Sequence, residues 1–152
     1  MTIIIPMAGL SQRFTDAGYS LPKYMLYAGV KSVFNISVSS FKKYFDTVNF
    51  LFIARNVNDT KSFIETECKL MGLNHYQIVI LESPTRGQAE TVYFGIKYSN
   101  LPKNEEILIF NIDTIRKNYT LPEDLLRYDG FLEVFKGKGE NWSYAEPFDN
   151  KS

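Results

Sequence analysis

The stretch IIIPMAGLSQRFTDAGYSLPKYML, residues 3–26, decides the fold and indicates where the chain binds its ligand. It begins with three consecutive isoleucines, a continuous apolar run typical of a strand buried on both faces of a parallel sheet. The chain bends at Pro6 and continues into a loop of small residues. Gly9 and its small neighbours Ala8 and Ser11 leave room for a ligand to approach backbone N–H groups.

Two cations follow this loop, and they make it a candidate phosphate cradle. Arg13 could grip phosphate oxygens as a planar fork, and Lys23, fixed behind Pro22, could act as a mobile point charge. An ordinary strand-to-helix turn with two solvated cations is the alternative that the residue types leave open. The loop is neither a dinucleotide fingerprint, which needs three glycines, nor a Walker loop, which needs Gly-Lys-Ser/Thr.

Composition and charge narrow the class of protein. The chain has 152 residues, about one domain's worth, and 45% of them are hydrophobic. Its 17 basic and 17 acidic residues leave a formal net charge of zero. DNA and RNA are therefore unlikely partners, although a single nucleotide is compatible with this charge. The lone Cys68 excludes an internal disulfide framework, and its neighbours predict a buried thiol on a helix.

The sequence contains no membrane or export signal. No apolar run approaches the roughly 20 residues of a membrane span. The N-terminus lacks the basic region and the long apolar core of a secretion signal. We therefore expect a cytoplasmic protein without a membrane partner.

Strands and helices alternate along the chain, which predicts the α/β class. Apolar patterns predict helices at about 34–45, 59–71 and 89–98, and further strands at 48–54, 76–82 and 106–113. The last of these helices would turn Ala89, Val92, Tyr93 and Ile96 inward. Helical crossovers of this length imply a Rossmann-like, open, mostly parallel sheet with helices on both faces. Beyond residue 113, alternation predicts a strand at 130–137 and another short one at 142–148.

Three candidate features fall at the carboxyl ends of the predicted strands, where such sheets bind ligands. They are the Gly9 loop, the loop of residues 86–88 and Asp113. The Asp113 carboxylate could hold Mg²⁺ against phosphate oxygens, or it could simply complete a turn with its neighbours Asn111 and Thr114. A single carboxylate is an incomplete Mg²⁺ site. The one histidine, His75, precedes a strand away from this edge, so no catalytic triad is indicated.

Four motifs in order resemble the sugar-phosphate nucleotidyltransferases, the nucleoside-diphosphate-sugar pyrophosphorylase superfamily. They are IIIPMAGLSQRF with LPKYML, GQAET, FNIDT, and DGFLEVFKG with NWSYAEP. The opening Ile-Pro-Met-Ala-Gly resembles the branch often found among capsule and surface-polysaccharide genes. The resemblance implies the fold of nucleotide-diphospho-sugar transferases.

The resemblance also implies roles for individual residues. Nucleotide binding would fall to Met7, Ala8, Gly9, Leu10 and Ser11 in the first loop, and to Gly87 and Gln88 in the base pocket. Arg13 would lie on the β- and γ-phosphates, and Lys23 near the α-phosphate and the incoming phosphate, as the two catalytic cations. Asp113 would bind the Mg²⁺ cofactor.

The implied reaction joins a nucleoside triphosphate to a sugar 1-phosphate or a similar phosphomonoester. A phosphate oxygen attacks the α-phosphorus and pyrophosphate leaves. Two residues depart from the family's pattern: Ser11 replaces the second signature glycine, and Ile112 replaces the glycine that often precedes the metal-binding aspartate. These changes put the loop's conformation and the metal site's surroundings in question.

The resemblance covers only the N-terminal part of a typical family member, so we expect a C-terminally truncated single domain. Residues 1–114 would be its nucleotide-binding βα units and residues 115–152 the start of the acceptor-side region. The second metal-binding aspartate of the family would be absent. A non-catalytic nucleotide-binding or regulatory fragment is therefore the first alternative.

A related nucleotide-sugar-dependent glycosyltransferase is the second alternative. It would need a second acidic residue two positions from Asp113, where this sequence has Asn111 and Ile115. The sequence does not specify the base, the acceptor or whether the chain forms a homo-oligomer.

Overall fold

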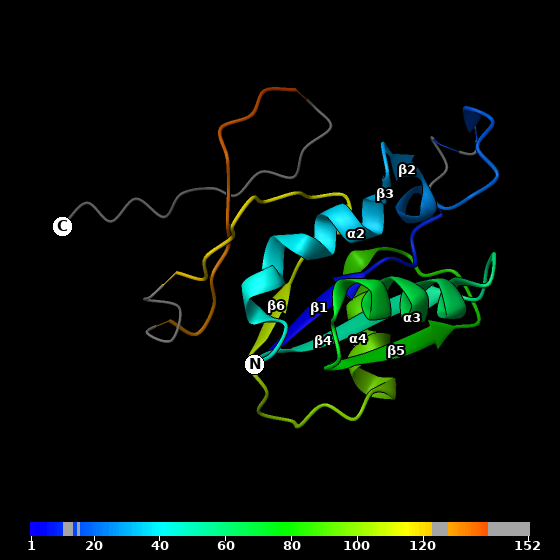
Figure 1. Cartoon of the computed structure of the whole chain (residues 1–152). Coiled ribbons are helices and arrows are strands. Elements are labelled where there is room, and N and C mark those ends of the chain that lie inside the picture. The colour runs from blue at the N-terminus through cyan, green and yellow to red at the C-terminus, as the bar shows by residue number, and fades with distance from the viewer. Residues whose placement is uncertain (11–13, 15, 123–127, 140–152) are drawn as a thin grey trace. The chain divides into compact units, whose positions relative to one another are not determined.

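The computed structural model of the chain describes residues 1–10, 14, 16–122 and 128–139 (Figure 1). The chain divides into two compact units, Met1–Tyr119 and Thr120–Ser152. Among the described residues, all the helices and strands lie in the first unit. In the second unit, residues 120–122 and 128–139 form no regular secondary structure. None of the helices in these described ranges is long and apolar enough to cross a membrane.

The first unit is built on a four-stranded sheet in which every pairing is parallel. Its strands are β1 (Thr2–Pro6), β4 (Asn49–Arg55), β5 (Tyr76–Leu81) and β6 (Ile107–Ile109). The order across the sheet is β5-β4-β1-β6, so β1 is central, with Thr2 opposite both Asn49 and Ile107. A small antiparallel hairpin of β2 (Tyr27–Ala28) and β3 (Lys31–Ser32) lies outside this sheet and was not predicted.

Helices cover both faces of the sheet, as the sequence predicts (Figure 1). The remaining elements are η1 (Lys23–Met25), α2 (Val33–Val38), η2 (Ser39–Tyr44), α3 (Thr60–Met71) and α4 (Gln88–Tyr98). One face packs against α2, η2 and α3, and the other packs against α4. The expected α/β fold with an open parallel sheet and helices on both faces is confirmed.

The three isoleucines of β1 explain why this strand occupies the middle of the sheet. Successive side chains of a strand point to opposite faces, so Ile3 and Ile5 enter the core beneath α2 and α3, while Ile4 enters the core beneath α4. All three side chains are fully buried. A strand with both faces covered has to be apolar at every position, which accounts for the unbroken run.

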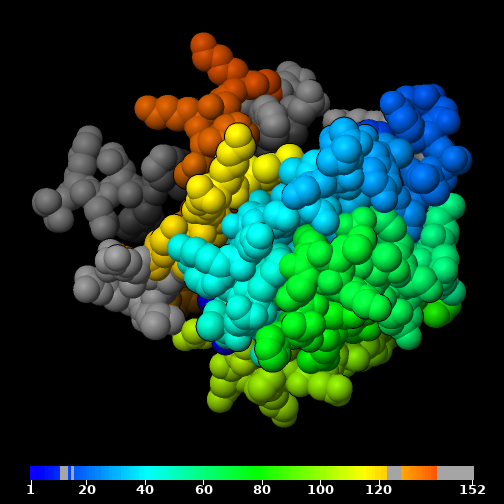
Figure 2. All heavy atoms as spheres, viewed as in Figure 1, coloured from blue at the N-terminus to red at the C-terminus, as the bar shows by residue number. Residues whose placement is uncertain are grey.

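The helix predicted at 34–45 forms, but as two pieces. Ser32 caps α2, because its Oγ accepts a hydrogen bond from the N–H of Asn35 at 3.0 Å. The backbone leaves helical geometry at Phe41, with φ −103° and ψ 17°, inside η2. The predicted apolar face is nevertheless buried as expected, with Phe34, Val38, Phe41 and Phe45 all in the core. Figure 2 shows α2 and α3 side by side on this face of the molecule.

The inward face of α4 differs from the prediction. Val92 is buried as expected, but Ala89, Tyr93 and Ile96 are exposed, and the helix instead buries Thr91 and Gly95. The reason is a close approach to the sheet. A Cβ on Gly95 would lie 2.5 Å from Cγ1 of Ile53 and closer still to Cδ1. The helix therefore approaches the sheet closely at Gly95. Of its aromatic side chains, Tyr93 and Tyr98 are exposed, while Phe94 is partly buried against the core on this face.

Two predicted strands also differ from the structure. The strand predicted at 106–113 is shorter, because regular pairing ends at Ile109 and the chain turns after Phe110, with the N–H of Thr114 donating to the carbonyl of Asn111 at 3.0 Å. The strand predicted at 130–137 is wrong, since residues 128–139 pair with no strand in the described part of the chain. The strand predicted at 142–148 lies outside the described residues.

Cys68 is fully buried on α3, and its burial should make the stability of the fold depend on pH in the alkaline range. Desolvation, reinforced by Glu67 and Glu65, raises the pKa of the thiol from 9.0 to about 12. Above pH 9 the unfolded chain loses this proton and the folded chain keeps it. The thiol's contribution to stability is therefore complete below pH 9 and is lost as the pH rises toward 12.

We expect Cys68→Ala to lose less stability than the wild type between pH 8 and pH 10.5. Urea unfolding of both proteins at the two pH values measures this difference. Burial also raises the pKa of Tyr24 and Tyr76, so some alkaline loss remains in the variant. Equal losses in the two proteins would contradict the prediction.

Candidate functional site

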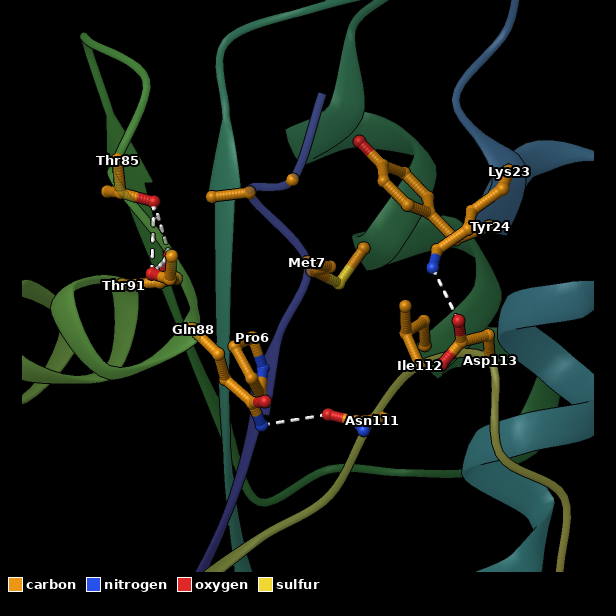
Figure 3. Close-up of a pocket in the computed structure, with 13 residues that line it drawn as sticks. Pro6, Met7, Lys23, Tyr24, Thr85, Gln88, Thr91, Asn111, Ile112 and Asp113 are labelled. Atoms are coloured by element: carbon orange, nitrogen blue, oxygen red, sulfur yellow. Dashed lines mark hydrogen bonds and ion pairs between the residues drawn. The ribbon is translucent and has the colours of Figure 1, made fainter. Parts of the chain in front are cut away.

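The strand order creates a crevice beside β1. From β1 the chain proceeds outward to β4 and β5, and it then returns to place β6 on the other side of β1. In an open parallel sheet, ligands bind beyond the carboxyl ends of the strands at such a switch point. A cavity of about 290 Å³ opens there (Figure 3). Four segments of the described chain line it: residues 6–9 after β1, residues 23–24, residues 85–91 around the start of α4, and residues 111–113 after β6.

Most of the site residues predicted from the sequence come together in this cavity. Its lining includes Met7, Ala8, Gly9, Lys23, Gly87, Gln88 and Asp113. Leu10 does not line it and instead lines a second cavity nearby. Ser11 and Arg13 lie outside the described residues.

The loop after β1 forms the floor of the cavity. The N–H of Met7 donates to the carbonyl of Ile53 at 2.8 Å, which extends the pairing of β1 with β4 by one residue. Met7 and Ala8 are buried, and the backbone becomes exposed at Gly9. A Cβ on Gly9 would meet no atom within 4 Å, so Gly9 faces open space that a ligand can fill.

An ion pair crosses one side of the cavity. Nζ of Lys23 lies 2.6 Å from Oδ2 of Asp113, although the two residues are far apart in the sequence (Figure 3). The Lys23 and Asp113 side chains are 28% and 54% exposed. Water screens a pair this exposed, which typically contributes less than 1 kcal/mol to stability. The pair can therefore be exchanged for ligand contacts at little cost to the fold.

Tyr24 anchors the short helix that carries Lys23. Its ring is buried, and its hydroxyl forms a hydrogen bond with Oγ1 of Thr60 at 2.9 Å. Burial raises the pKa of this phenol, and the bond to Thr60 and the charge of Arg55 partly offset that rise. The neutral phenol therefore holds η1 against α3 and fixes where the Lys23 side chain begins.

The opposite side of the cavity is held by a network of polar contacts. Nε2 of Gln88, the first residue of α4, donates to Oδ1 of Asn111 at 2.8 Å (Figure 3). The hydroxyls of Thr85 and Thr91 lie 2.6 Å apart, and Thr91 donates to the carbonyl of Gly87 at 3.0 Å. These bonds fix the loop before α4, so Gln88 is presented to the cavity in a defined position.

The carboxylate of Glu90, in the first turn of α4, also holds this loop in place. Oε2 of Glu90 accepts a hydrogen bond from the N–H of Arg86 at 2.6 Å, and Oε1 accepts from Nε of Arg86 at 2.8 Å. The backbone bond is the main reason that the pKa of Glu90 is lowered. Both contacts tie the loop to the first turn of the helix.

The donor set of the cavity fits Mg²⁺ in one specific way. Proteins usually hold Mg²⁺ through one or two carboxylates together with substrate phosphates and water. Asp113 supplies one carboxylate in the described lining, and no group of three metal-ligating side chains occurs among the described residues. The residues present fit an ion that arrives with phosphate and do not form an all-protein cage.

Some residues of the cavity were not identified from the sequence. Thr85, Thr91 and Tyr24 line it, but threonine and tyrosine are common and none of the three lies in a pattern that indicates a ligand. Asn111 was noted only as a neighbour of Asp113. These residues could have been found from their places in the sequence, beside Lys23, GQAET and Asp113. Neighbours of a binding residue at a strand end usually line the same cavity.

The chain is similar to the crystal structure of a nucleoside-diphosphate-sugar pyrophosphorylase from Vibrio cholerae RC9, with 46% sequence identity and a TM-score of 0.91. The match covers 99% of this chain and 63% of the Vibrio chain, so the present chain spans less than two thirds of that protein's length. No protein-family model and no curated protein sequence matches the chain.

Proposed function

We infer that the chain belongs to the sugar-phosphate nucleotidyltransferase superfamily, because it is 46% identical to the Vibrio pyrophosphorylase over 99% of its own length. On that premise we propose that it binds a nucleoside triphosphate in the cavity beside β1. There it would join the nucleotide to a sugar 1-phosphate or similar phosphomonoester. The observation that carries the proposal is the convergence of Gly9, Lys23, Gln88 and Asp113 on one cavity at the switch point of the sheet.

Each part of the cavity suits one part of the nucleotide. The open space at Gly9 lets phosphate oxygens approach the backbone N–H groups of residues 8–10. Gly87 and the fixed amide of Gln88 suit the base, which needs directional hydrogen bonds. Lys23 lines the same cavity on the side opposite Gln88 and suits the α-phosphate. Arg13 and Ser11 complete the proposed phosphate contacts from the same loop.

The proposed reaction forms one P–O bond and breaks another. A phosphate oxygen of the acceptor attacks the α-phosphorus, and the bond from that phosphorus to the bridging oxygen of the β-phosphate breaks. Pyrophosphate leaves with the electron pair. The attacking oxygen is already anionic, so no residue has to remove a proton. Catalysis then rests on alignment of the two phosphates and on positive charge at the α-phosphate, which Lys23 supplies.

We propose Mg²⁺ as the cofactor, held by Asp113 together with the phosphates. Bound there, it would neutralise charge on the phosphate oxygens. In the free chain Asp113 pairs with Lys23, so nucleotide binding would separate the pair. Lys23 would then turn its ammonium group toward the α-phosphate, and Asp113 would keep a positive partner.

The wider setting is also a proposal. The Ile-Pro-Met-Ala-Gly opening supports a role in capsule or surface-polysaccharide biosynthesis. We place the reaction in the cytoplasm, where nucleoside triphosphates and sugar phosphates are available. Whether copies of the chain associate is a question for sedimentation measurements on the purified protein.

Two measurements on the same preparation test the proposed function. Calorimetry with each of the common nucleoside triphosphates, with and without Mg²⁺, tests binding. A pyrophosphate-release assay across triphosphates and sugar 1-phosphates tests turnover. We expect saturable binding of one triphosphate that chelation of Mg²⁺ weakens. Binding without turnover would identify a non-catalytic nucleotide-binding unit, and no binding of any triphosphate would refute the proposal.

A further inference from the structure

Arg55 is a cation at the ligand-binding edge of the sheet that the proposed reaction does not use. It is the last residue of β4, the strand that pairs with β1, and Pro6 of β1 lies opposite Ile53. Arg55 therefore stands just beyond the pairing, beside the loop that carries Gly9. The carboxyl end of β4 thus brings a guanidinium group to the same edge as Lys23.

The guanidinium of Arg55 contains a hydrogen-bond donor that is not satisfied. Its Nε atom is buried and has no hydrogen-bond partner. Among the described residues, no carboxylate lies close enough to the Arg55 guanidinium to form an ion pair, for which the limit is 4.0 Å. Burial of a charged donor without a partner is unfavourable, and an anion bound beside it would relieve that cost.

A second cavity gives this donor a place for an anion. It has a volume of about 180 Å³ and shares Met7, Gly9 and Tyr24 with the first cavity. Arg55 is the one charged side chain in its described lining, which contains no carboxylate. Ser20, Tyr19 and Asn58 add neutral polar groups. The chemistry of this cavity therefore selects a negatively charged, oxygen-rich ligand.

Tyr24 places the charge of Arg55 next to the first cavity. Tyr24 lines both cavities. Burial raises the pKa of its phenol, and the nearby positive charge of Arg55 is one of the two effects that partly offset this rise. The guanidinium thus lies near the wall that the two cavities share. A ligand that fills the first cavity and crosses Gly9 would reach it.

We infer that Arg55 binds the terminal phosphates of the nucleoside triphosphate, the pair that leaves as pyrophosphate. This inference rests on the proposed function, which puts the base and the α-phosphate in the first cavity. The β- and γ-phosphates then cross the open space at Gly9 into the second cavity, where the planar guanidinium can hold two phosphate oxygens at once. Lys23 and Arg55 stabilise different phosphates, so the α-phosphate is held on one side of Gly9 and the leaving group on the other.

Inorganic pyrophosphate is the probe that tests this site separately from nucleotide transfer. We compare calorimetric titrations of the wild type, Arg55→Gln, Arg55→Lys and the charge-matched control Lys69→Gln, whose side chain is exposed on α3. Arg55→Gln is expected to weaken pyrophosphate binding roughly tenfold to a hundredfold, as for loss of a charge-assisted hydrogen bond. Arg55→Lys keeps the charge without the fork, and an intermediate loss is expected. Lys69→Gln is expected to bind like the wild type.

The same variants then distinguish the sources of the phosphate. With the triphosphate that the wild type binds and its monophosphate, Arg55→Gln is expected to weaken only the triphosphate. Equal weakening of both nucleotides, weakening of the sugar 1-phosphate alone, or pyrophosphate binding as in the wild type would overturn the inference. If Arg55→Gln does not fold, Arg55→Lys decides by the same comparisons.

The outcome also separates this inference from the proposed function. A wild type that binds pyrophosphate through Arg55 but binds no nucleotide would refute the proposed function and support the pyrophosphate site. A wild type that binds a triphosphate, with no change in Arg55→Gln, would support the proposed function and refute the role of Arg55.

Discussion

Lys23→Gln is expected to weaken binding of the Mg²⁺-triphosphate complex roughly tenfold to a hundredfold, because a charge-assisted contact to phosphate is lost. Turnover is expected to fall further, by about 10²- to 10³-fold, since the ammonium group stabilises charge that develops at the α-phosphate during transfer. Calorimetry measures the first effect, and pyrophosphate release with the triphosphate and acceptor that the wild type uses measures the second.

The control for this variant is Lys97→Gln, which removes the same charge from the exposed surface of α4. It is expected to bind and react like the wild type. The free energy of unfolding of Lys23→Gln should also lie within about 1 kcal/mol of the wild-type value, because the ion pair with Asp113 is exposed. Equal binding and turnover in the wild type and Lys23→Gln would remove Lys23 from the proposed mechanism.

Gly95→Val is expected to destabilise the fold by about 3 kcal/mol, the upper end for overpacking of a core. The reason is the close approach of α4 to β4, where a Cβ would overlap the fully buried side chain of Ile53. Urea unfolding measures the loss. Lys97→Val places the same β-branched residue on the exposed side of the helix and is expected to cost only about 0.5 kcal/mol.

A second pair of variants tests whether Ile53 is the cause. Gly95→Ala is expected to cost about 1–2 kcal/mol, even though alanine favours helix. Ile53→Val alone costs about 1 kcal/mol through lost burial, but it removes the Cδ1 atom that meets the new Cβ. The double variant is therefore expected to be more stable than the sum of the two single losses. If the two losses of stability simply add, Ile53 is not the residue that excludes a side chain at position 95.

Much of the fold was predictable because its two central strands, β1 and β4, are nearly continuous in apolar residues. The run of isoleucines in β1 and the aromatic run in β4 leave few alternatives to buried parallel strands. The face of α4 was not predictable by the same reasoning, because Val92, Tyr93 and Ile96 have a helical spacing that suits burial. The close approach at Gly95 depends on Ile53, far away in the sequence, and no local pattern reports such a contact.

The candidate site divides in a similar way. Gly9, Lys23 and Asp113 were identified from motifs, and their meeting at one cavity follows from the rule that strand ends share an edge. The ion pair between Lys23 and Asp113 was not predicted, since it depends on where η1 rests against α3. Arg55 was overlooked because it belongs to no motif, although its position at the end of a strand was a signal that the same rule could have used.

The central position of β1 also has a consequence for how the chain is made. β1 precedes both of its partners, β4 and β6, in the sequence, so its edge toward β6 stays unpaired until most of the first unit has been translated. At 5–20 residues per second, β6 follows β1 by about 5–20 s. For that time a strand of three isoleucines keeps one hydrogen-bonding edge open, and exposed apolar edges of this kind are prone to aggregation.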